Sequence, residues 1–170
     1  MTIIDANLLL YAYNADAPQQ KASAQWLQEL LKSGGMIGLP WVTLWAFIRI
    51  STNSRIWANP KSAKEAFAIV GEWLRQPGVV PLHPGPLHPE ILEKLVSDHG
   101  ATGPLVTDAV LAALAMEHGA LLASTDQDFR RFPELRWLNP LGTWQCALAC
   151  RCGTCHLVVN RALMAGGVAE

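Results

Sequence analysis

Short apolar runs alternate with longer segments of helical periodicity along the first 141 residues. An apolar run of a few residues that ends in polar or turn-forming residues is typical of a buried strand in a parallel sheet. Such runs occupy residues 2–4, 36–39, 79–82, 120–124 and 135–138. We expect the run 120–124 to be the central strand and the run 135–138 to lie at an edge.

The segments between these runs place apolar residues three or four positions apart, as on one face of a helix. Helices are predicted to start at Leu8 and to cover residues 18–31, 41–52, 61–76, 89–99 and 104–118. Strands that alternate with helices indicate an α/β fold, in which helices cover both faces of a mostly parallel sheet.

Acidic residues stand where two of the predicted strands end. Asp5 follows the first run, and Asp126 and Asp128 follow the run 120–124. Open parallel sheets bind ligands at the carboxyl ends of their strands. Two carboxylates that lie ~4 Å apart near a surface repel each other by about 4 kcal/mol, so this pair indicates a nearby cation, commonly a divalent metal. The alternative is that Asp126 only caps a short helix that starts there.

Asp108 is a third acidic residue of interest, because it lies in the first turn of the otherwise apolar helix 104–118. An unpaired buried charge is costly, so Asp108 should face a cleft or a cation, unless it only complements the helix N-terminus. If Asp5, Asp108 and Asp126 converge at one sheet edge, their carboxyl carbons should lie within roughly 8 Å, a span that one or two Mg²⁺ or Mn²⁺ ions can bridge. Such a centre suits phosphodiester hydrolysis.

Composition narrows the class of protein. A chain of 170 residues with 51% apolar and 16% charged residues predicts a globular domain rather than a disordered one. The net charge of −1 provides no global basic field, so a polyanion would have to bind at a local patch. No apolar run reaches ~18 residues and the N-terminus lacks a signal-peptide pattern, so we expect a cytoplasmic protein without a membrane segment.

Two further groups contain metal-binding residue types. His83 and His88 lie in a Pro-rich loop, without a Cys or carboxylate at ligand spacing inside it. Residues 142–170 hold Cys146, Cys150, Cys152, Cys155 and His156. The pair Cys152 and Cys155 has the spacing of a metal knuckle, but a second such pair is missing. We therefore expect a domain over 1–141 and a Cys-containing C-terminal extension over 142–170, which is flexible or depends on a partner, with a bound metal as the less favoured alternative.

Three stretches contain these acidic residues, and they occur in the order Ile4-Asp5-Ala6-Asn7-Leu8-Leu9, Thr107-Asp108-Ala109 and Ser124-Thr125-Asp126-Gln127-Asp128-Phe129. In this order they resemble the PIN domain, and specifically the VapC-type toxins of bacterial type II toxin–antitoxin modules. The resemblance runs from residue 1 to about 141. It implies a three-layer α/β/α sandwich, a Mg²⁺-dependent (or Mn²⁺-dependent) endoribonuclease acting on RNA, a homodimer, and a cognate antitoxin.

The resemblance also implies roles for individual residues. By position, Asp5, Asp108 and Asp126 would be catalytic metal ligands, and Asp128 would be a further ligand or would support them. Asn7 and Thr125 would orient these carboxylates. Arg49 and Arg55 flank the helix 41–52. They are candidates for contacts to RNA phosphates, with ordinary solvated or dimer-edge positions as the alternative.

One position departs from the family pattern. The family usually carries a Glu in the helix after the second strand, where the best match is Ala46, and no carboxylate occurs between Glu29 and Glu65. A methyl group neither binds Mg²⁺ nor orders a water. Two hypotheses follow, an active ribonuclease rebuilt around the Asp residues and a catalytically impaired PIN-like module that binds RNA. A phosphotransferase of the haloacid-dehalogenase type is disfavoured, because Asn7 stands where that chemistry needs a second Asp.

Overall fold

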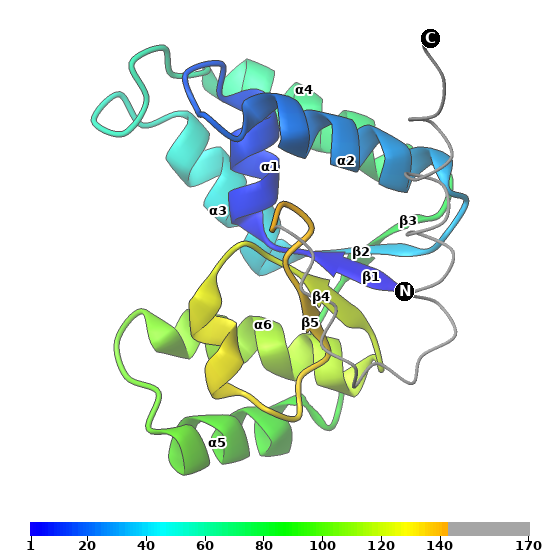
Figure 1. Ribbon diagram of the computed structural model, residues 1–170, viewed down its shortest axis with the longest axis vertical. Coiled ribbons are helices and arrows are strands. Elements are labelled where there is room, and N and C mark those ends of the chain that lie inside the picture. The colour runs from blue at the N-terminus through cyan, green and yellow to red at the C-terminus, as the bar shows by residue number, and fades with distance from the viewer. Residues whose placement is uncertain (143–170) are drawn as a thin grey trace, which may run out of the picture.

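The computed structural model describes residues 1–142, which form a five-stranded sheet between two layers of helices (Figure 1). The strands are β1 (Thr2–Ile4), β2 (Ile37–Pro40), β3 (Val79–Leu82), β4 (Leu121–Ala123) and β5 (Trp137–Leu138). Their order across the sheet is β3-β2-β1-β4-β5, and all four pairings are parallel. The predicted α/β fold with a mostly parallel sheet is therefore confirmed.

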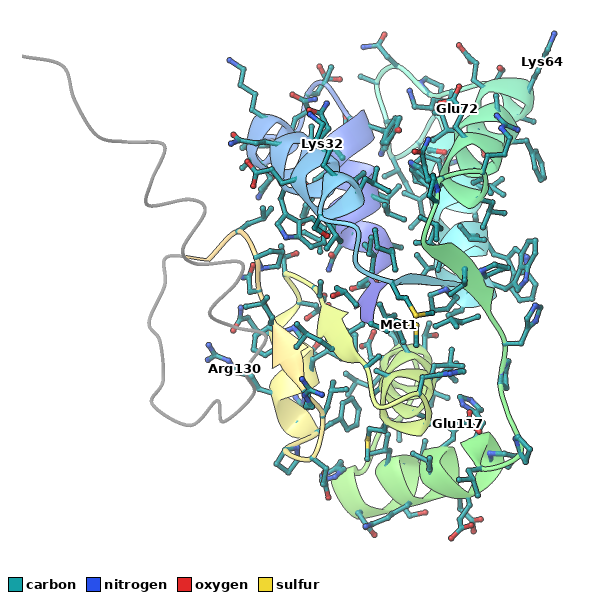
Figure 2. The ribbon with its side chains drawn as sticks, turned by 90° about the vertical axis from the view of Figure 1, so that its right-hand side faces the viewer. Met1, Lys32, Lys64, Glu72, Glu117 and Arg130 are labelled. Carbon is teal, nitrogen blue, oxygen red and sulfur yellow. The ribbon has the colours of Figure 1, made fainter. Side chains whose placement is uncertain are left out.

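The helices divide into two layers. They are α1 (Ala6–Tyr13), α2 (Gln20–Lys32), α3 (Trp41–Ser51), α4 (Ala63–Leu74), α5 (His88–His99) and α6 (Leu105–Glu117), and a 3-10 helix, η1, covers Gln127–Arg131. Helices α1 to α4 lie on one side of the sheet and α5 and α6 on the other (Figure 1). Figure 2 shows the same division, with Lys64 and Glu72 in one layer and Glu117 in the other. Each layer packs its own hydrophobic core against the sheet, which makes the predicted three-layer sandwich.

The central strand of the sheet is β1. The prediction that the run 120–124 is the central strand is therefore wrong. Strand β1 pairs with β2 on one side and β4 on the other, and its Ile3 and Ile4 are almost fully buried. Strand β4 lies between β1 and β5, and β5 is at an edge as predicted. Because β1 and β4 are parallel neighbours, the residues that follow them, Asp5 and Ser124, leave the sheet side by side.

Helix α3 starts without a connecting loop, because Pro40 is both the last residue of β2 and the residue at the N-cap position of the helix. Its Leu44 and Phe47 are fully buried in the core beneath α1, α2 and α4. The Thr43 hydroxyl donates a hydrogen bond to the carbonyl of Ile4, at 3.1 Å. This bond holds the first turn of α3 against the end of β1. Among residues 1–142, none of the helices combines the length and hydrophobicity that crossing a bilayer requires.

Candidate metal centre

Asp5 marks the point where β1 passes into α1. One of its carboxylate oxygens accepts the N–H of Ala6 at 2.6 Å and so caps the helix, and the other accepts the hydroxyl of Ser124 at 2.6 Å. Burial raises the pKa of Asp5, and the hydrogen bonds from Ser124 and Ala6 oppose that change without cancelling it. Both oxygens of Asp5 are therefore already held by the protein itself.

Ser124 connects the polar residues of this sheet edge. Its side chain is fully buried, and its hydroxyl donates to Asp5 and accepts the Asn7 amide at 2.9 Å and the backbone N–H of Asp126 at 3.0 Å. Sequence reasoning missed this residue. The available signal was its position directly after a buried apolar strand, where a hydroxyl needs partners because it lies out of water.

Asn7 extends the same network from the first turn of α1. Its carbonyl oxygen accepts the backbone N–H of Thr125 at 3.5 Å, while its amide donates to Ser124. Within residues 1–142, Thr125 takes part through its backbone, and its hydroxyl makes no hydrogen bond to another residue. Ser124 is thus the member of this network whose side chain bonds directly to a carboxylate, and Asn7 reaches Asp5 through Ser124. The roles of Asn7 and Thr125 in orienting the carboxylates stay predictions.

Asp108, Asp126 and Asp128 form the acidic cluster of the described residues. Each offers one carboxylate oxygen, and these atoms lie within 4.8 Å of one another. Asp126 also caps η1, because one of its oxygens accepts the N–H of Asp128 at 2.9 Å. The capping role and the membership of the acidic cluster, which we had weighed as alternatives, therefore occur together. Asp5 lies outside this set of three.

Asp108 connects the cluster to Asp5, because these two residues line the same pocket. Burial raises the pKa of Asp108, and the charges of Asp126, Asp5 and Asp128 raise it further, to about 6. A cation among these groups would relieve the repulsion that produces this shift. Oxygen atoms within 4.8 Å of one another can also surround a single hard cation, which takes its oxygen ligands at about 2.0–2.6 Å. The residues present therefore fit a divalent metal such as Mg²⁺.

A small pocket of about 40 Å³ opens beside these carboxylates, and we refer to it as the acidic pocket. Asp5 and Asp108 line it, and Thr43 and Ala46 of α3 form part of its wall. Ala46, which stands where the family usually has a Glu, therefore lies beside the carboxylates of Asp5 and Asp108. About 10–15 Å³ of such space is enough to hold one water, so the acidic pocket has room for water.

Basic residues occur in and after α3, which carries Ala46, and in η1, which carries Asp128. Arg49 in the last turn of α3 and Arg55 in the following loop are both exposed. Sequence reasoning missed the arginines of η1, although they follow Asp128 closely. The Arg131 Nε lies 3.4 Å from a carboxylate oxygen of Asp128, in a pair that is more than half exposed. The Arg130 guanidinium lies 5.7 Å from the centre of the Trp137 ring.

The other suggested metal ligands lie apart from this centre. His83 Nε2 accepts the indole N–H of Trp41 at 3.2 Å. His88 is buried at the start of α5, with its Nδ1 3.8 Å from Glu117. Neither belongs to a group of three metal-binding residues within 1–142. The expected Cys-containing extension, with Cys146, Cys150, Cys152, Cys155 and His156, lies outside the described residues and stays a prediction.

Comparison with known proteins places this arrangement in a family. The family model described as "PIN domain" matches residues 2–135. Ribonuclease VapC37 of Mycobacterium tuberculosis is 40% identical over 140 residues, which cover 82% of this chain and 97% of the relative. Ribonuclease VapC33 of the same species is 41% identical over 141 residues, which cover 83% of this chain and 99% of that protein.

Solved structures agree on the fold. The structure of VapBC2 from Rickettsia felis bound to a promoter DNA fragment matches with a TM-score of 0.61 at 17% identity, over 81% of this chain and 97% of the other. The M. tuberculosis toxin VapC20, described as cleaving the sarcin–ricin loop, matches with a TM-score of 0.59 at 15% identity, over 76% and 93%. Together with the curated relatives, the order of the Asp-containing stretches and the parallel sheet show that this chain belongs to the PIN-domain family, among the VapC-type ribonuclease toxins.

Proposed function

We propose that this chain hydrolyses RNA phosphodiester bonds as a Mg²⁺-dependent or Mn²⁺-dependent endoribonuclease. The observation that carries the proposal is the acidic cluster, in which oxygens of Asp108, Asp126 and Asp128 lie within 4.8 Å of one another at the carboxyl edge of the sheet. These three residues are the proposed metal ligands. Asp5 is proposed as a fourth acidic group that lines the same pocket as Asp108.

A divalent ion held there would supply charge neutralisation at the phosphate and a lowered pKa for an attacking water. The protein's own groups prepare the site. Ser124 and the Ala6 N–H fix the carboxylate of Asp5, and the Ser124 hydroxyl also positions the backbone of Asp126. Asp108 has a pKa of about 6, so it is mostly deprotonated and available as a ligand at neutral pH.

Ala46 is the residue on which the two hypotheses, an active ribonuclease and an impaired RNA-binding module, differ. It forms part of the wall of the acidic pocket without contributing a carboxylate. We favour an active enzyme whose site relies on the Asp residues, because Asp128 adds an extra acid to the cluster. The alternative is a catalytically impaired module that binds RNA.

The test is cleavage of RNA by the purified full chain across a Mg²⁺ and Mn²⁺ titration. We expect cleavage that a chelator abolishes and that Asp108→Asn slows by at least about 100-fold, as expected when a metal ligand is lost. Glu93→Gln is a matched control, because it removes a carboxylate from the exposed face of α5. Normal metal binding without any cleavage would contradict the enzyme and leave the RNA-binding module.

We also propose that the chain is a cytoplasmic toxin held in check by a cognate antitoxin, and that it forms a homodimer. Structures similar to it include VapBC2, FitAB and VapBC-1, which by their descriptions are assemblies. An Arg or Lys of the partner would pair well with the acidic cluster, because charge-assisted pairs with carboxylates are strong. A small antitoxin should co-purify, and its removal should release activity. A chain that expresses alone without harming its host would contradict this proposal.

A further inference from the structure

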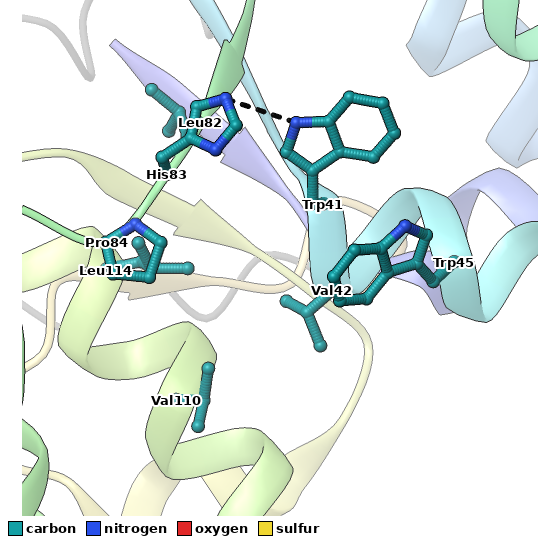
Figure 3. Close-up of a pocket in the computed structure, with 8 residues that line it drawn as sticks. All are labelled: Trp41, Val42, Trp45, Leu82, His83, Pro84, Val110 and Leu114. Atoms are coloured by element: carbon teal, nitrogen blue, oxygen red, sulfur yellow. Dashed lines mark hydrogen bonds between the residues drawn. The ribbon is translucent and has the colours of Figure 1, made fainter.

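A second and larger pocket lies beside the acidic pocket, between α3, α6 and the end of β3 (Figure 3). Its volume is about 500 Å³, and we call it the aromatic pocket. Trp41 and Trp45 of α3 face Val110 and Leu114 of α6 across it, and His83 lies at the end of β3 (Figure 3). The pocket is apolar, and none of the residues that line it carries a fixed charge.

The two pockets are neighbours on the same helices, α3 and α6. Val42 of α3 lines both of them. Helix α3 supplies Ala46 to the acidic pocket and Trp45 to the aromatic pocket, and α6 supplies Asp108 to the first and Val110 to the second. A molecule that reaches the carboxylates therefore lies next to an aromatic surface.

The aromatic side chains are arranged to leave ring surface free. The Trp45 side chain is 63% exposed. Its ring centre lies 6.2 Å from that of Trp41 at an interplanar angle of 41°, so the two rings do not stack on each other. The indole N–H of Trp41 is occupied by His83 Nε2, which fixes the Trp41 ring (Figure 3). Because Nε2 accepts, the neutral His83 ring carries its proton on Nδ1, a second hydrogen-bond donor at the exposed rim.

We propose that the aromatic pocket receives an unpaired nucleobase of the RNA whose phosphate lies at the acidic cluster, with Trp45 as the stacking surface. The inference rests on the proposed ribonuclease function. Aromatic side chains stack on any base, because every base has a π-face, whereas a phosphate would need the positive charge that this pocket lacks. A base within a duplex cannot enter, so the pocket selects single-stranded RNA near the cleavage position.

The test measures RNA binding without cleavage. A fluorescently labelled single-stranded RNA of about ten nucleotides is titrated with the full chain in a chelator, and the dissociation constant is read from anisotropy. Trp45→Ala should weaken binding by about 5- to 150-fold, the loss expected for one stacked base. Phe67→Ala is the matched control, because Phe67 is 61% exposed on α4 and lines neither pocket.

Base removal distinguishes stacking from other roles of Trp45. A series of RNAs is prepared, each with one abasic nucleotide at a different position. At one position, removal of the base should weaken binding to the unmodified protein but leave the affinity of Trp45→Ala unchanged. Binding to the same sequence as a duplex should be equal in the two proteins. Trp45→Phe, which keeps an aromatic face, should recover part of the affinity.

Two results would overturn the proposal. One is equal RNA affinity of Trp45→Ala and Phe67→Ala. The other is a change of oligomeric state, in which the mass of Trp45→Ala by light scattering differs from that of the unmodified chain while both proteins respond alike to the abasic RNAs. The face around Trp45 would then be an interface between copies of the chain. The ribonuclease function is tested separately by cleavage in Mn²⁺. Absence of cleavage with retained Trp45-dependent binding would refute that function and support the base-binding pocket.

Discussion

Ser124→Ala removes the hydroxyl that connects Asp5, Asn7 and Asp126, and its cost follows from the contacts of that hydroxyl. The mutation deletes one hydrogen bond to a carboxylate, at 2.6 Å, and two to N–H donors, at 2.9 and 3.0 Å. A hydrogen bond to a charged group contributes about 1.5–3 kcal/mol and a neutral one about 1 kcal/mol. Asn7 and Asp126 are only partly buried, so we expect the free energy of unfolding to fall by about 3 kcal/mol, below the sum of the three bonds.

Ser23→Ala provides the matched control for this measurement. Ser23 is also fully buried, but its hydroxyl makes a single hydrogen bond, to the carbonyl of Leu8 at 2.6 Å. Its loss should cost about 1 kcal/mol. The assay is urea unfolding of both variants in a chelator, followed by calorimetric titration with Mn²⁺. Ser124→Ala should also weaken Mn²⁺ binding about 10-fold, as for other groups that orient metal ligands. Equal losses of stability in the two variants, with unchanged Mn²⁺ affinity, would refute the reasoning.

Three further predictions concern the acidic pocket and the loop that follows β3. Ala46→Glu places a carboxylate in the pocket that Asp5 and Asp108 line, and in an active enzyme we expect unchanged or slower RNA cleavage because the carboxylates repel each other. A gain of about 100-fold at matched stability would show that the native site is impaired. In the metal-free protein, the stability relative to Asp108→Asn should fall as the pH rises from about 4 to about 6, because folding raises the pKa of Asp108 from 3.8 to about 6 and only the folded chain keeps that proton. Mn²⁺ affinity should rise over the same range, and a flat calorimetric profile would contradict this assignment. Gly85→Ala would bring a Cβ to 2.5 Å from an oxygen of Glu117, whose carboxylate accepts the N–H groups of Gly85 and Leu87 at 2.9 Å. Urea unfolding should show a loss of about 1–3 kcal/mol, and full stability would show that Glu117 does not hold this loop.

The positions of the acidic residues could be predicted where a local sequence pattern is combined with the parallel order of the strands. Asp5 and Asp126 follow apolar runs, and parallel strands bring the ends of such runs to one edge, so their proximity could be predicted. Asp108 could be predicted because a charge is unusual on a helix as apolar as α6. Helix α3 begins and ends within one residue of its predicted bounds, and Ala46 faces the expected pocket.

The remaining features depend on contacts that no local pattern encodes. Ser124 bonds to Asp5 and Asn7 across 119 and 117 residues, and a serine after a strand has no periodicity that reveals its partners. The choice of Ser124 over Thr125 follows from which of two adjacent side chains points inward. The position of β4 beside the middle strand also depended on pairing, because β1 is flanked by two partners of similar length and hydrophobicity.

The hydrogen bonds of Ser124 have a fixed direction. A hydroxyl has one proton and two lone pairs. Here the lone pairs receive the N–H groups of Asn7 and Asp126, so the single proton has to point at Asp5. A proton on that oxygen of Asp5 would find no acceptor on Ser124. The fixed hydroxyl of Ser124 therefore favours the ionised form of Asp5 and opposes the effect of burial on its pKa. Asp108 has no such hydrogen bond among the causes that set its pKa, so a bound cation is what would favour its ionised form.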